Sequence, residues 1–370
     1  MSPTTETATN TAPGAHVVFL GAGAIGGTMA ALVHRAGRLR TTIVDPWFQH
    51  VDAIRRKGLF VDLVSESFTT DVLALHVDQL GRLPAPADLV VLSTKAYDSE
   101  WAVRLIEPYL ADGGCILVAQ NGITEEWLST VTDPGRLIGC GITNYPGECF
   151  VPGRIKRTPL GSNEPAFTIG ELDGSRSDRV EKVAEWLTPA GDIKVTDRIW
   201  SVLWGKLALN LMSNALGGIT GYTTHHLWSD PDIAAVGLLC GAEAALVADK
   251  LGIAMDPVFG RIQAPDMRDG MLGDDQAWRR AMAELNGMGG ERVGASENKP
   301  SLLQDVLKGR RTEIDYLNGY VATKAPTVGL TAPVNAAVTD LMKEVERGAV
   351  ERGPERVDDL RSILAAHRPH

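Results

Sequence analysis

The chain has few cysteines, and they do not form a redox or metal motif. The four cysteines, Cys115, Cys140, Cys149 and Cys240, show no CxxC spacing and are too sparse for a disulfide scaffold in 370 residues. We therefore expect reduced thiols in a cytoplasmic protein. A metal site is not expected.

Basic residues are in the minority. Lys and Arg total 36 against 46 Asp and Glu, which gives a formal net charge of -10, and no cluster of basic residues is visible. A protein that binds nucleic acid without sequence preference needs a basic face to neutralise phosphates. The composition therefore argues against nucleic acid as a partner and favours small solutes.

The sequence also lacks the marks of export and of membrane insertion. The opening residues MSPTTETATNTAPGA have neither the basic start nor the apolar core of a secretory signal, and no uninterrupted apolar run reaches bilayer length. We expect no membrane association. We interpret residues 1–14 as a disordered tail.

The length and the order of apolar segments predict a two-domain α/β protein. Short β-rich runs occur at residues 16–20, 41–44, 89–93, 115–119 and 136–140, and helical patterns such as 98–110 and 124–130 lie between them. This alternation predicts a Rossmann-type, doubly wound, mostly parallel sheet.

The second half of the chain has a different character. Residues 145–175 are rich in Gly and Pro and contain the extended run 166–169, which predicts antiparallel additions at one edge of the sheet. From about residue 197 the pattern is almost wholly helical. We predict a dinucleotide-binding domain over residues 15–195 and an all-helical domain for substrate binding and dimerisation over residues 196–370.

The segment GAGAIG directly follows the first predicted strand and opens a helix. The first glycine of GxGxxG permits a tight turn, the second lets a pyrophosphate approach, and the third allows close packing, while the helix N-terminus presents amides to the anion. An acid at the end of the second strand can bind the adenosine ribose. A glycine-rich turn without ligand is the alternative. The predicted cofactor-binding residues here are Gly21, Gly23, Ala24, Ile25, Gly26 and Asp45.

Residues 199–216 have the composition of one buried helix, because they are apolar nearly all round. Lys206, Asn210 and Asn214 occur in it at four-residue intervals and therefore on one side. A buried ammonium and two amides need polar partners, so this row predicts an adjoining polar cavity. A solvated stripe is the alternative, although two tryptophans and three leucines leave little room for it.

A carboxylate interrupts another apolar pattern. Residues 301–319, interpreted as a helix, carry a stripe of apolar residues that includes Glu313. Glu313 therefore borders a polar cleft, or it forms an internal ion pair with Arg310 or Arg311. Ser301 and the glutamine three residues later also fit a capping box at the start of this helix.

Two further candidates follow predicted strands. Lys95 lies just past the strand at 89–93, and Asn121 follows the strand at 115–119. The carboxyl ends of parallel strands form the ligand crevice of an open sheet. Solvated loop positions are the alternative for both residues.

Five segments together resemble the ketopantoate reductase family, in order and over nearly the whole chain. They are GAGAIG, KAYDS from Lys95, QNG from Gln120, WGKLALN from Trp204 and PSLLQDVLKGRRTEIDYLNG from Pro300. The resemblance implies a Rossmann domain joined to a helical domain, with nicotinamide and a 2-oxo acid meeting in the cleft between them.

The resemblance also implies residue roles. Lys206 would be the general acid toward the carbonyl oxygen and Glu313 its partner in the ternary complex. The substrate would lie among Asn210, Asn214 and Ser301, while Lys95 and Asn121 would flank substrate and nicotinamide. A lysine with a lowered pKa can both stabilise negative charge on oxygen and donate a proton, and no metal is needed.

Two departures from the family pattern affect function. Asp45 follows the second strand and the next basic residue is Arg55, so NAD is expected rather than NADP, whose 2′-phosphate an aspartate repels. Residues 255–299 are longer than this region needs, so we expect them to shape the substrate pocket or an oligomer contact.

The leading interpretation is an oxidoreductase that transfers a hydride between NAD(H) and a small 2-hydroxy or 2-oxo acid, or a related alcohol or carbonyl compound. We expect a homo-oligomer, specifically a dimer. One alternative is an NADPH-dependent 2-dehydropantoate 2-reductase of pantothenate synthesis. The other is a non-catalytic dinucleotide-sensing protein, which is expected to have lost Lys206 or Glu313, yet both are present.

Overall fold

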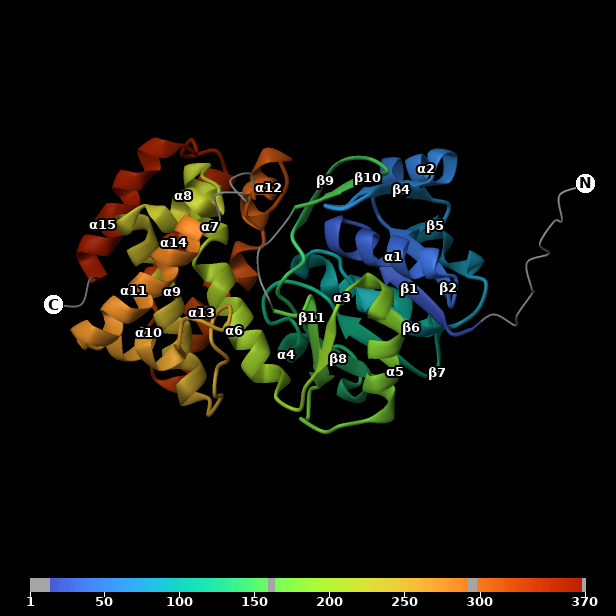
Figure 1. Cartoon of the computed structure of the whole chain (residues 1–370), viewed down its shortest axis with the longest axis horizontal. Helices are drawn as coiled ribbons and strands as arrows, with labels where there is room; N and C mark the ends of the chain where they lie inside the picture. The colour runs from blue at the N-terminus through green and yellow to red at the C-terminus, as the bar shows by residue number, and fades with distance from the viewer. Residues whose placement is uncertain (1–13, 159–163, 292–297, 368–370) are drawn as a thin grey trace, which may run out of the picture.

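The computed structural model describes residues 14–158, 164–291 and 298–367. Strands and helices alternate in the N-terminal region, and the C-terminal region is built from helices (Figure 1). The mixed α/β fold class predicted from the sequence is therefore confirmed. Residues 1–13 of the predicted tail lie outside the described part of the chain.

The N-terminal region contains the strands β1 (His16–Leu20), β2 (Arg40–Asp45), β3 (Leu59–Asp62), β4 (Ser67–Thr70), β5 (Leu73–His76), β6 (Ala87–Leu92), β7 (Leu110–Val118), β8 (Leu137–Ile142), β9 (Gly147–Val151), β10 (Arg154–Arg157), β11 (Phe167–Glu171) and β12 (Ile193–Val195). Its α-helices are α1 (Ala24–Ala36), α2 (Phe48–Lys57), α3 (Ser99–Ile106), α4 (Glu125–Leu128) and α5 (Asp178–Leu187).

The main sheet has the strand order β12-β11-β8-β7-β6-β1-β2-β5. All pairs from β8 to β5 are parallel, and β11 joins β8 in antiparallel register. The predicted parallel sheet and its antiparallel edge are therefore both present. Because β1 pairs with β2 on one side and β6 on the other, the chain order reverses at β1, and a ligand crevice forms outside the carboxyl ends of the strands at such a point.

Both faces of this sheet are covered, as a parallel sheet requires. Side chains of β1 alternate between two cores, with Val17 and Phe19 in one and Val18 and Leu20 in the other. Helices α1 and α5 contribute to the first core, and α3 and α4 to the second. Residues 17–20 of the strand are consequently all apolar, which is why the sequence shows a continuous β-rich run there.

A second sheet, with the order β4-β3-β10-β9, lies next to helix α1. A Cβ built on Gly147 in β9 would lie 3.5 Å from the Cβ of Ala24, the first residue of α1. Strand β9 therefore passes directly beside the N-terminus of α1.

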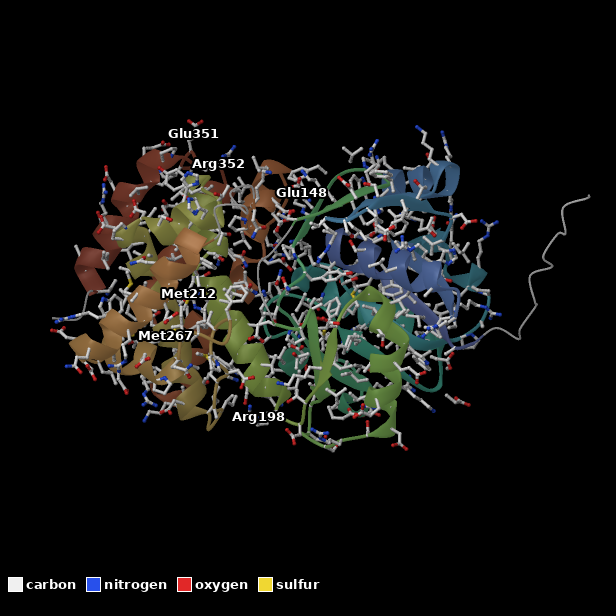
Figure 2. The ribbon with its side chains drawn as sticks, viewed as in Figure 1. Glu148, Arg198, Met212, Met267, Glu351 and Arg352 are labelled. Atoms are coloured by element: carbon white, nitrogen blue, oxygen red, sulfur yellow. The ribbon has the colours of Figure 1, made fainter. Side chains whose placement is uncertain are left out.

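The C-terminal region contains α6 (Ile199–Leu211), α7 (Asn214–Thr220), α8 (Thr224–Ser229), α9 (Pro231–Lys250), α10 (Ala264–Met271), α11 (Asp275–Glu291), α12 (Ser301–Leu307), α13 (Asn318–Lys324), α14 (Pro333–Glu346) and α15 (Val357–His367). They share one core, in which Met212 and Met267 are fully buried (Figure 2).

Helix α9 is the centre of this region. It is long and apolar enough to cross a membrane, but 83% of its apolar window is buried inside the protein. It also carries Glu243, whose carboxylate accepts hydrogen bonds from the backbone amides of Val334 and Asn335, both at 2.9 Å. Glu243 thus satisfies the first amides of α14, as expected for a core helix that anchors its neighbours.

The prediction of one continuous helix over residues 199–216 is wrong. Helix α6 ends at Leu211, and α7 begins at Asn214. The backbone leaves the helical conformation at Ser213 (φ -143°), and the indole of Trp228 donates to the carbonyl of Met212 at 3.2 Å. Packing against α8 therefore breaks a segment whose composition alone indicated one helix.

The helix predicted over residues 301–319 is also interrupted. Helix α12 ends at Leu307, a turn follows, and a short 3-10 helix, η7 (Ile314–Tyr316), precedes α13. Gly309 has φ +64°, the left-handed conformation that commonly ends a helix. The predicted capping box is wrong as well, because Ser301 is the first helical residue and its side chain caps no amide of α12.

Candidate active site

A cavity of about 390 Å³ lies between the sheet edge and the helical region. Its wall combines the glycine turn after β1, the ends of β2, β6 and β7, and parts of α6, α7 and α12. All predicted site residues except Gly26 line it, namely Gly21, Gly23, Ala24, Ile25, Asp45, Lys95, Asn121, Lys206, Asn210, Asn214, Ser301 and Glu313. Residues that are up to almost three hundred positions apart in the sequence thus share one cavity.

The glycines of the turn occupy three different environments. Gly21 has φ +99°, and a Cβ there would lie 2.6 Å from the amide nitrogen of Thr94. A Cβ on Gly26 would lie 2.0 Å from the hydroxyl oxygen of Ser93, so this glycine permits close packing away from the cavity. A Cβ on Gly23 would meet nothing within 4 Å. Gly23 therefore leaves room for a ligand to approach the backbone.

The N-terminus of α1 is suited to bind an anion. Gly23 is its N-cap and supplies no side-chain acceptor, and the first turn contains no acidic residue. The first amides of the helix therefore have no side-chain partner at the N-cap and carry the positive end of the helix dipole. This arrangement fits a pyrophosphate.

Asp45 holds the turn in place. One carboxylate oxygen accepts a hydrogen bond from the amide of Ala22 at 2.5 Å, and the other accepts from the amide of Trp47 at 2.7 Å. The side chain is buried but lines the cavity. A carboxylate oxygen has more than one lone pair, so these contacts leave capacity for a ligand hydroxyl.

Glu313 lies in the turn that precedes η7, not in a helix. Its exposed fraction is only 2%, and its carboxylate accepts hydrogen bonds from the ammonium of Lys95 at 2.7 Å and from the amide of Ala96 at 2.9 Å. The alternative of an internal ion pair with Arg310 or Arg311 is not found, because Arg310 pairs with Asp305 and Arg311 pairs with Asp315. A contact of Glu313 with Lys206 in a substrate complex stays a prediction.

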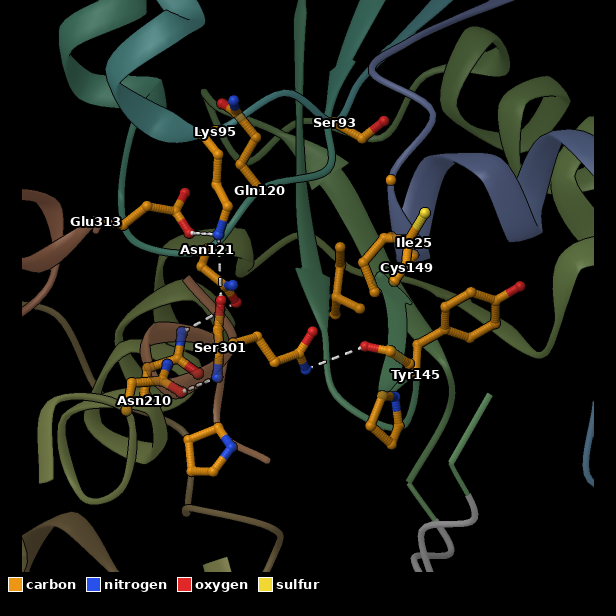
Figure 3. Close-up of a pocket in the computed structure, with 18 of the residues that line it drawn as sticks. Ile25, Ser93, Lys95, Gln120, Asn121, Tyr145, Cys149, Asn210, Ser301 and Glu313 are labelled. Atoms are coloured by element: carbon orange, nitrogen blue, oxygen red, sulfur yellow. Dashed lines mark hydrogen bonds and ion pairs between the residues drawn. The ribbon is translucent and has the colours of Figure 1, made fainter. Parts of the chain in front are cut away.

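Lys95 is the centre of a buried charge cluster. Its ammonium lies 2.7 Å from carboxylate oxygens of both Asp305 and Glu313. It also lies 3.4 Å from the hydroxyl of Ser301, and Figure 3 shows its contacts to Glu313 and Ser301. Burial by itself lowers the pKa of Lys95, but the two carboxylates raise it more, so its pKa lies above the ordinary value. Lys95 therefore stays charged and joins the end of β6 to the helical region.

The two asparagines of the predicted row make different links, one between the two regions and one within the helical region (Figure 3). The amide of Asn210 donates to the side-chain oxygen of Asn121 at 3.2 Å. The side-chain oxygen of Asn214 accepts from the backbone amide of Ser301 at 3.0 Å. Asn214 begins α7, so the row is continued by a second helix rather than by α6.

Lys206 lies one turn before Asn210 on α6 and is half-buried. It lines the main cavity and also a second cavity of about 150 Å³, with which the main cavity shares Thr143, Leu209 and Phe259. The side chain is thus placed where polar atoms of a bound molecule could reach it. The row formed by Lys206, Asn210 and Asn214 therefore borders a cavity, as predicted from the sequence.

Two residues of the site were not predicted from the sequence. Asp305 is fully buried and forms ion pairs with both Lys95 and Arg310. It lies four residues after Ser301, within the segment 301–319 that carries Glu313. Gln120 fixes the turn before Asn121, because its side-chain amide donates to the carbonyl of Thr94 at 2.8 Å. The QNG motif was the available signal for Gln120, whereas the partners of Asp305 are set by tertiary contacts.

Two family profiles match the chain in succession. The profile described as Ketopantoate reductase PanE/ApbA matches residues 17–161, and the profile described as Ketopantoate reductase PanE/ApbA C terminal matches residues 198–346. A 2-dehydropantoate 2-reductase of Mesorhizobium japonicum is 31% identical over 361 residues, which cover 91% of this chain and 98% of that protein. The chain belongs to the ketopantoate reductase family. The resemblance inferred from the five segments is thereby confirmed, and the protein is a ketopantoate-reductase-like oxidoreductase acting on a CH-OH group.

Further members and solved structures agree. A 2-dehydropantoate 2-reductase of Pyrococcus abyssi is 29% identical and covers 89% of this chain and 97% of its own. A D-mandelate dehydrogenase, solved with NADH and anilino(oxo)acetate, superposes with a TM-score of 0.75 at 22% identity over 90% of this chain and 99% of that one. A ketopantoate reductase from Ralstonia eutropha gives 0.71 at 24% identity, with the same coverage. Both structures share the ketopantoate reductase fold with this chain.

Proposed function

We propose that the protein transfers a hydride between NAD(H) and a small 2-hydroxy or 2-oxo acid, or a related alcohol or carbonyl compound. The observation that carries the proposal is that one cavity is lined both by the glycine turn of α1 and by the Lys206 and Asn210 face of α6. A nicotinamide dinucleotide, when bound, supplies or accepts the hydride. The chain's own residues bind it, orient the substrate and move the proton.

The glycine turn and the first amides of α1 hold the pyrophosphate in this proposal, and Asp45 accepts from the adenosine ribose. Lys206 donates its Nζ proton to the carbonyl oxygen during reduction and takes a proton from the hydroxyl during oxidation. Lys95 is less suited to that role, because its two carboxylate partners raise its pKa. It instead holds Glu313 and Ser301 at the edge of the site.

Asn210, Asn214 and Ser301 surround the substrate in this proposal, with Asn121 between it and the nicotinamide. The Asn210 to Asn121 hydrogen bond supports the assignment, since it places amides from both regions together at the cavity wall. Glu313 faces the same cavity and contacts the substrate hydroxyl and Lys206 in the ternary complex.

The test of this function is a screen for cofactor and substrate together. Reduction of NAD+ and NADP+ is measured with a panel of 2-hydroxy acids, and oxidation of NADH and NADPH is measured with 2-dehydropantoate. We expect NAD-linked turnover of one or more hydroxy acids. Turnover confined to 2-dehydropantoate with NADPH would instead establish the biosynthetic alternative, which the names of the relatives favour.

The preference for NAD over NADP is a separate prediction that rests on Asp45. Changing Asp45→Ser together with Trp47→Arg should shift the ratio of kcat/KM for the two cofactors toward NADP by about tenfold or more, because a repelling carboxylate is removed and a cation is added. Trp47→Arg alone is the control, since it keeps the Asp45 contacts to Ala22 and should shift the ratio less. An unmodified protein that uses NADPH at least as well as NADH would contradict the interpretation of Asp45.

Residues 255–300 are proposed to decide substrate choice. Helices α10 and α11 in this segment belong to the helical core, whereas Phe259, Asn298, Lys299 and Pro300 line the cavity. Residues 292–297 lie outside the described part of the chain.

Phe259 gives a local test of this segment, because shortening the segment would remove core side chains. Phe259→Ala should raise KM for the substrate about tenfold through lost apolar contact and change the Kd for NADH by less than twofold. Equal losses in both quantities would show that Phe259 supports the whole fold.

The proposed division into residues 15–195 and 196–370 is supported by β12, which still pairs in the main sheet, and by α6, which begins at Ile199. We propose a cytoplasmic homodimer with small-molecule ligands as its partners. Light scattering of the purified protein measures the subunit number directly, and a monomer at micromolar concentration would exclude a stable dimer.

A further inference from the structure

Helix α12 and the turn after it form one wall of the cavity, opposite the sheet edge. The side chain of Gln304 donates to the carbonyl of Gly147 at 3.3 Å, and Lys299 forms an ion pair with Glu148 at 3.4 Å. Gly147 and Glu148 belong to β9, and Glu148 lies at the junction of the two regions (Figure 2). The helical region therefore reaches across to the strand that passes beside the N-terminus of α1.

Lys308 is the C-cap of α12 and extends from this wall. Its ammonium lies 4.5 Å from the centre of the Phe150 ring in β9, and the residue lines the main cavity. A cation over an aromatic ring is stabilised modestly, by about 1 kcal/mol. The aromatic contact orients the side chain but does not neutralise its charge.

Lys308 differs from three other cations of the cavity wall. Lys95, Lys299 and Arg310 each form an ion pair with a carboxylate. Among the described residues, no carboxylate lies within ion-pair distance of Lys308. Burial, followed by the adjacent Arg310, lowers the pKa of Lys308 to about 8. A half-buried ammonium without a carboxylate at ion-pair distance is stabilised by any anion that enters the cavity.

The position of Lys308 indicates which anion it can meet. Cys149 precedes Phe150 in β9, and its thiol lies 3.9 Å from Nδ1 of His50 in α2, the helix that follows Asp45. Because Lys308 lies over Phe150, it points toward the end of the cavity where Asp45 lies. Strand β9 brings the same end next to Ala24 at the start of α1. The amides of α1 therefore face this end from the sheet side, and Lys308 faces it from the helical side.

We propose that Lys308 binds the pyrophosphate of the dinucleotide from the helical side of the cavity, opposite the amides of α1. The site then holds the phosphates between the two regions. This inference rests on the proposed function, since it requires a dinucleotide as ligand.

The test measures dissociation constants for NADH, NADPH and ADP-ribose with the full-length protein and with Lys308→Met. We expect Lys308→Met to weaken all three by about 10- to 100-fold, because each carries a pyrophosphate that loses a charge-assisted hydrogen bond. Lys308→Arg should stay within about threefold of the unmodified protein. Lys250→Met, at the exposed end of α9, is the matched control and should change nothing.

The outcomes separate the inference from the proposed function. Weakening confined to NADPH would assign Lys308 to the adenosine 2′-phosphate and overturn the pyrophosphate contact. Unchanged constants for all three ligands would overturn it as well, while leaving NAD(H)-dependent function intact. An unmodified protein that binds none of the ligands overturns both.

A pH profile distinguishes a phosphate contact from a purely structural role. The pyrophosphate selects the protonated form of Lys308, so the Kd for ADP-ribose should rise by up to tenfold per pH unit above about pH 8 and stay flat in Lys308→Arg. Of the groups around Lys308, Arg310 and Lys95 have raised pKa values, burial raises the pKa of Cys149 to about 11, and Asp305 pairs with both cations. An identical slope in Lys308→Arg would exclude Lys308 as the titrating group.

Discussion

Replacing Lys206 by methionine is expected to cut turnover by about 10²- to 10⁴-fold, the usual contribution of a positioned general acid or base. Methionine keeps much of the length and packing of the side chain but cannot carry a proton. Lys206 lines the cavity one turn before Asn210, so its loss removes the proposed proton donor without removing a core residue. The measurement is kcat at saturating substrate and cofactor.

The dissociation constant for NADH should change little in the same variant, because Lys206 is not among the proposed pyrophosphate and ribose contacts. Lys194→Met is a matched control, since Lys194 lines the second cavity together with Lys206 but not the main one. A folded Lys206→Met protein with nearly full turnover would remove Lys206 from the mechanism. It would favour the non-catalytic dinucleotide-binding alternative only if the unmodified protein also shows no turnover.

The second large effect is expected at Lys95, on stability. Lys95→Met leaves the carboxylates of Asp305 and Glu313 buried without their shared ammonium, and their exposed fractions are 0% and 2%. Removing one partner of a buried ion pair costs about 3–5 kcal/mol of unfolding free energy, and water at the 19% exposed Lys95 side chain makes this an upper bound. Urea unfolding at pH 7 measures the loss.

A double-mutant cycle tests whether the cluster acts as a unit. The combination of Lys95→Met with Glu313→Gln should lose less stability than the sum of the single changes, because the second change removes a charge that the first left unpaired. Lys250→Met again serves as the exposed lysine control. Strict additivity, or a loss below about 1 kcal/mol for Lys95→Met, would mean that solvent screens the cluster.

Local sequence patterns predicted the elements that depend on local physics. The run at residues 16–20 matches β1 residue for residue, because a strand buried on both faces is apolar along most of its length, here over residues 17–20. The glycine turn was predictable for a similar reason, since a backbone with φ +99° at Gly21 strongly favours glycine. The left-handed Gly309 that ends α12 was also visible as a possible helix stop, yet the apolar stripe that continues beyond it concealed the break.

By itself the sequence determined the fold class, the family and twelve of the residues that line the cavity, because these follow from hydrophobic period, turn chemistry and motif order. Only the tertiary structure decided which charges meet. Lys95 and Glu313 are 218 positions apart, and Lys95 and Asp305 are 210 apart. No local pattern ties residues so distant to one another. Their pairing arises because the docking of α12 onto the sheet edge buries all three together, and buried charges are tolerated only in pairs.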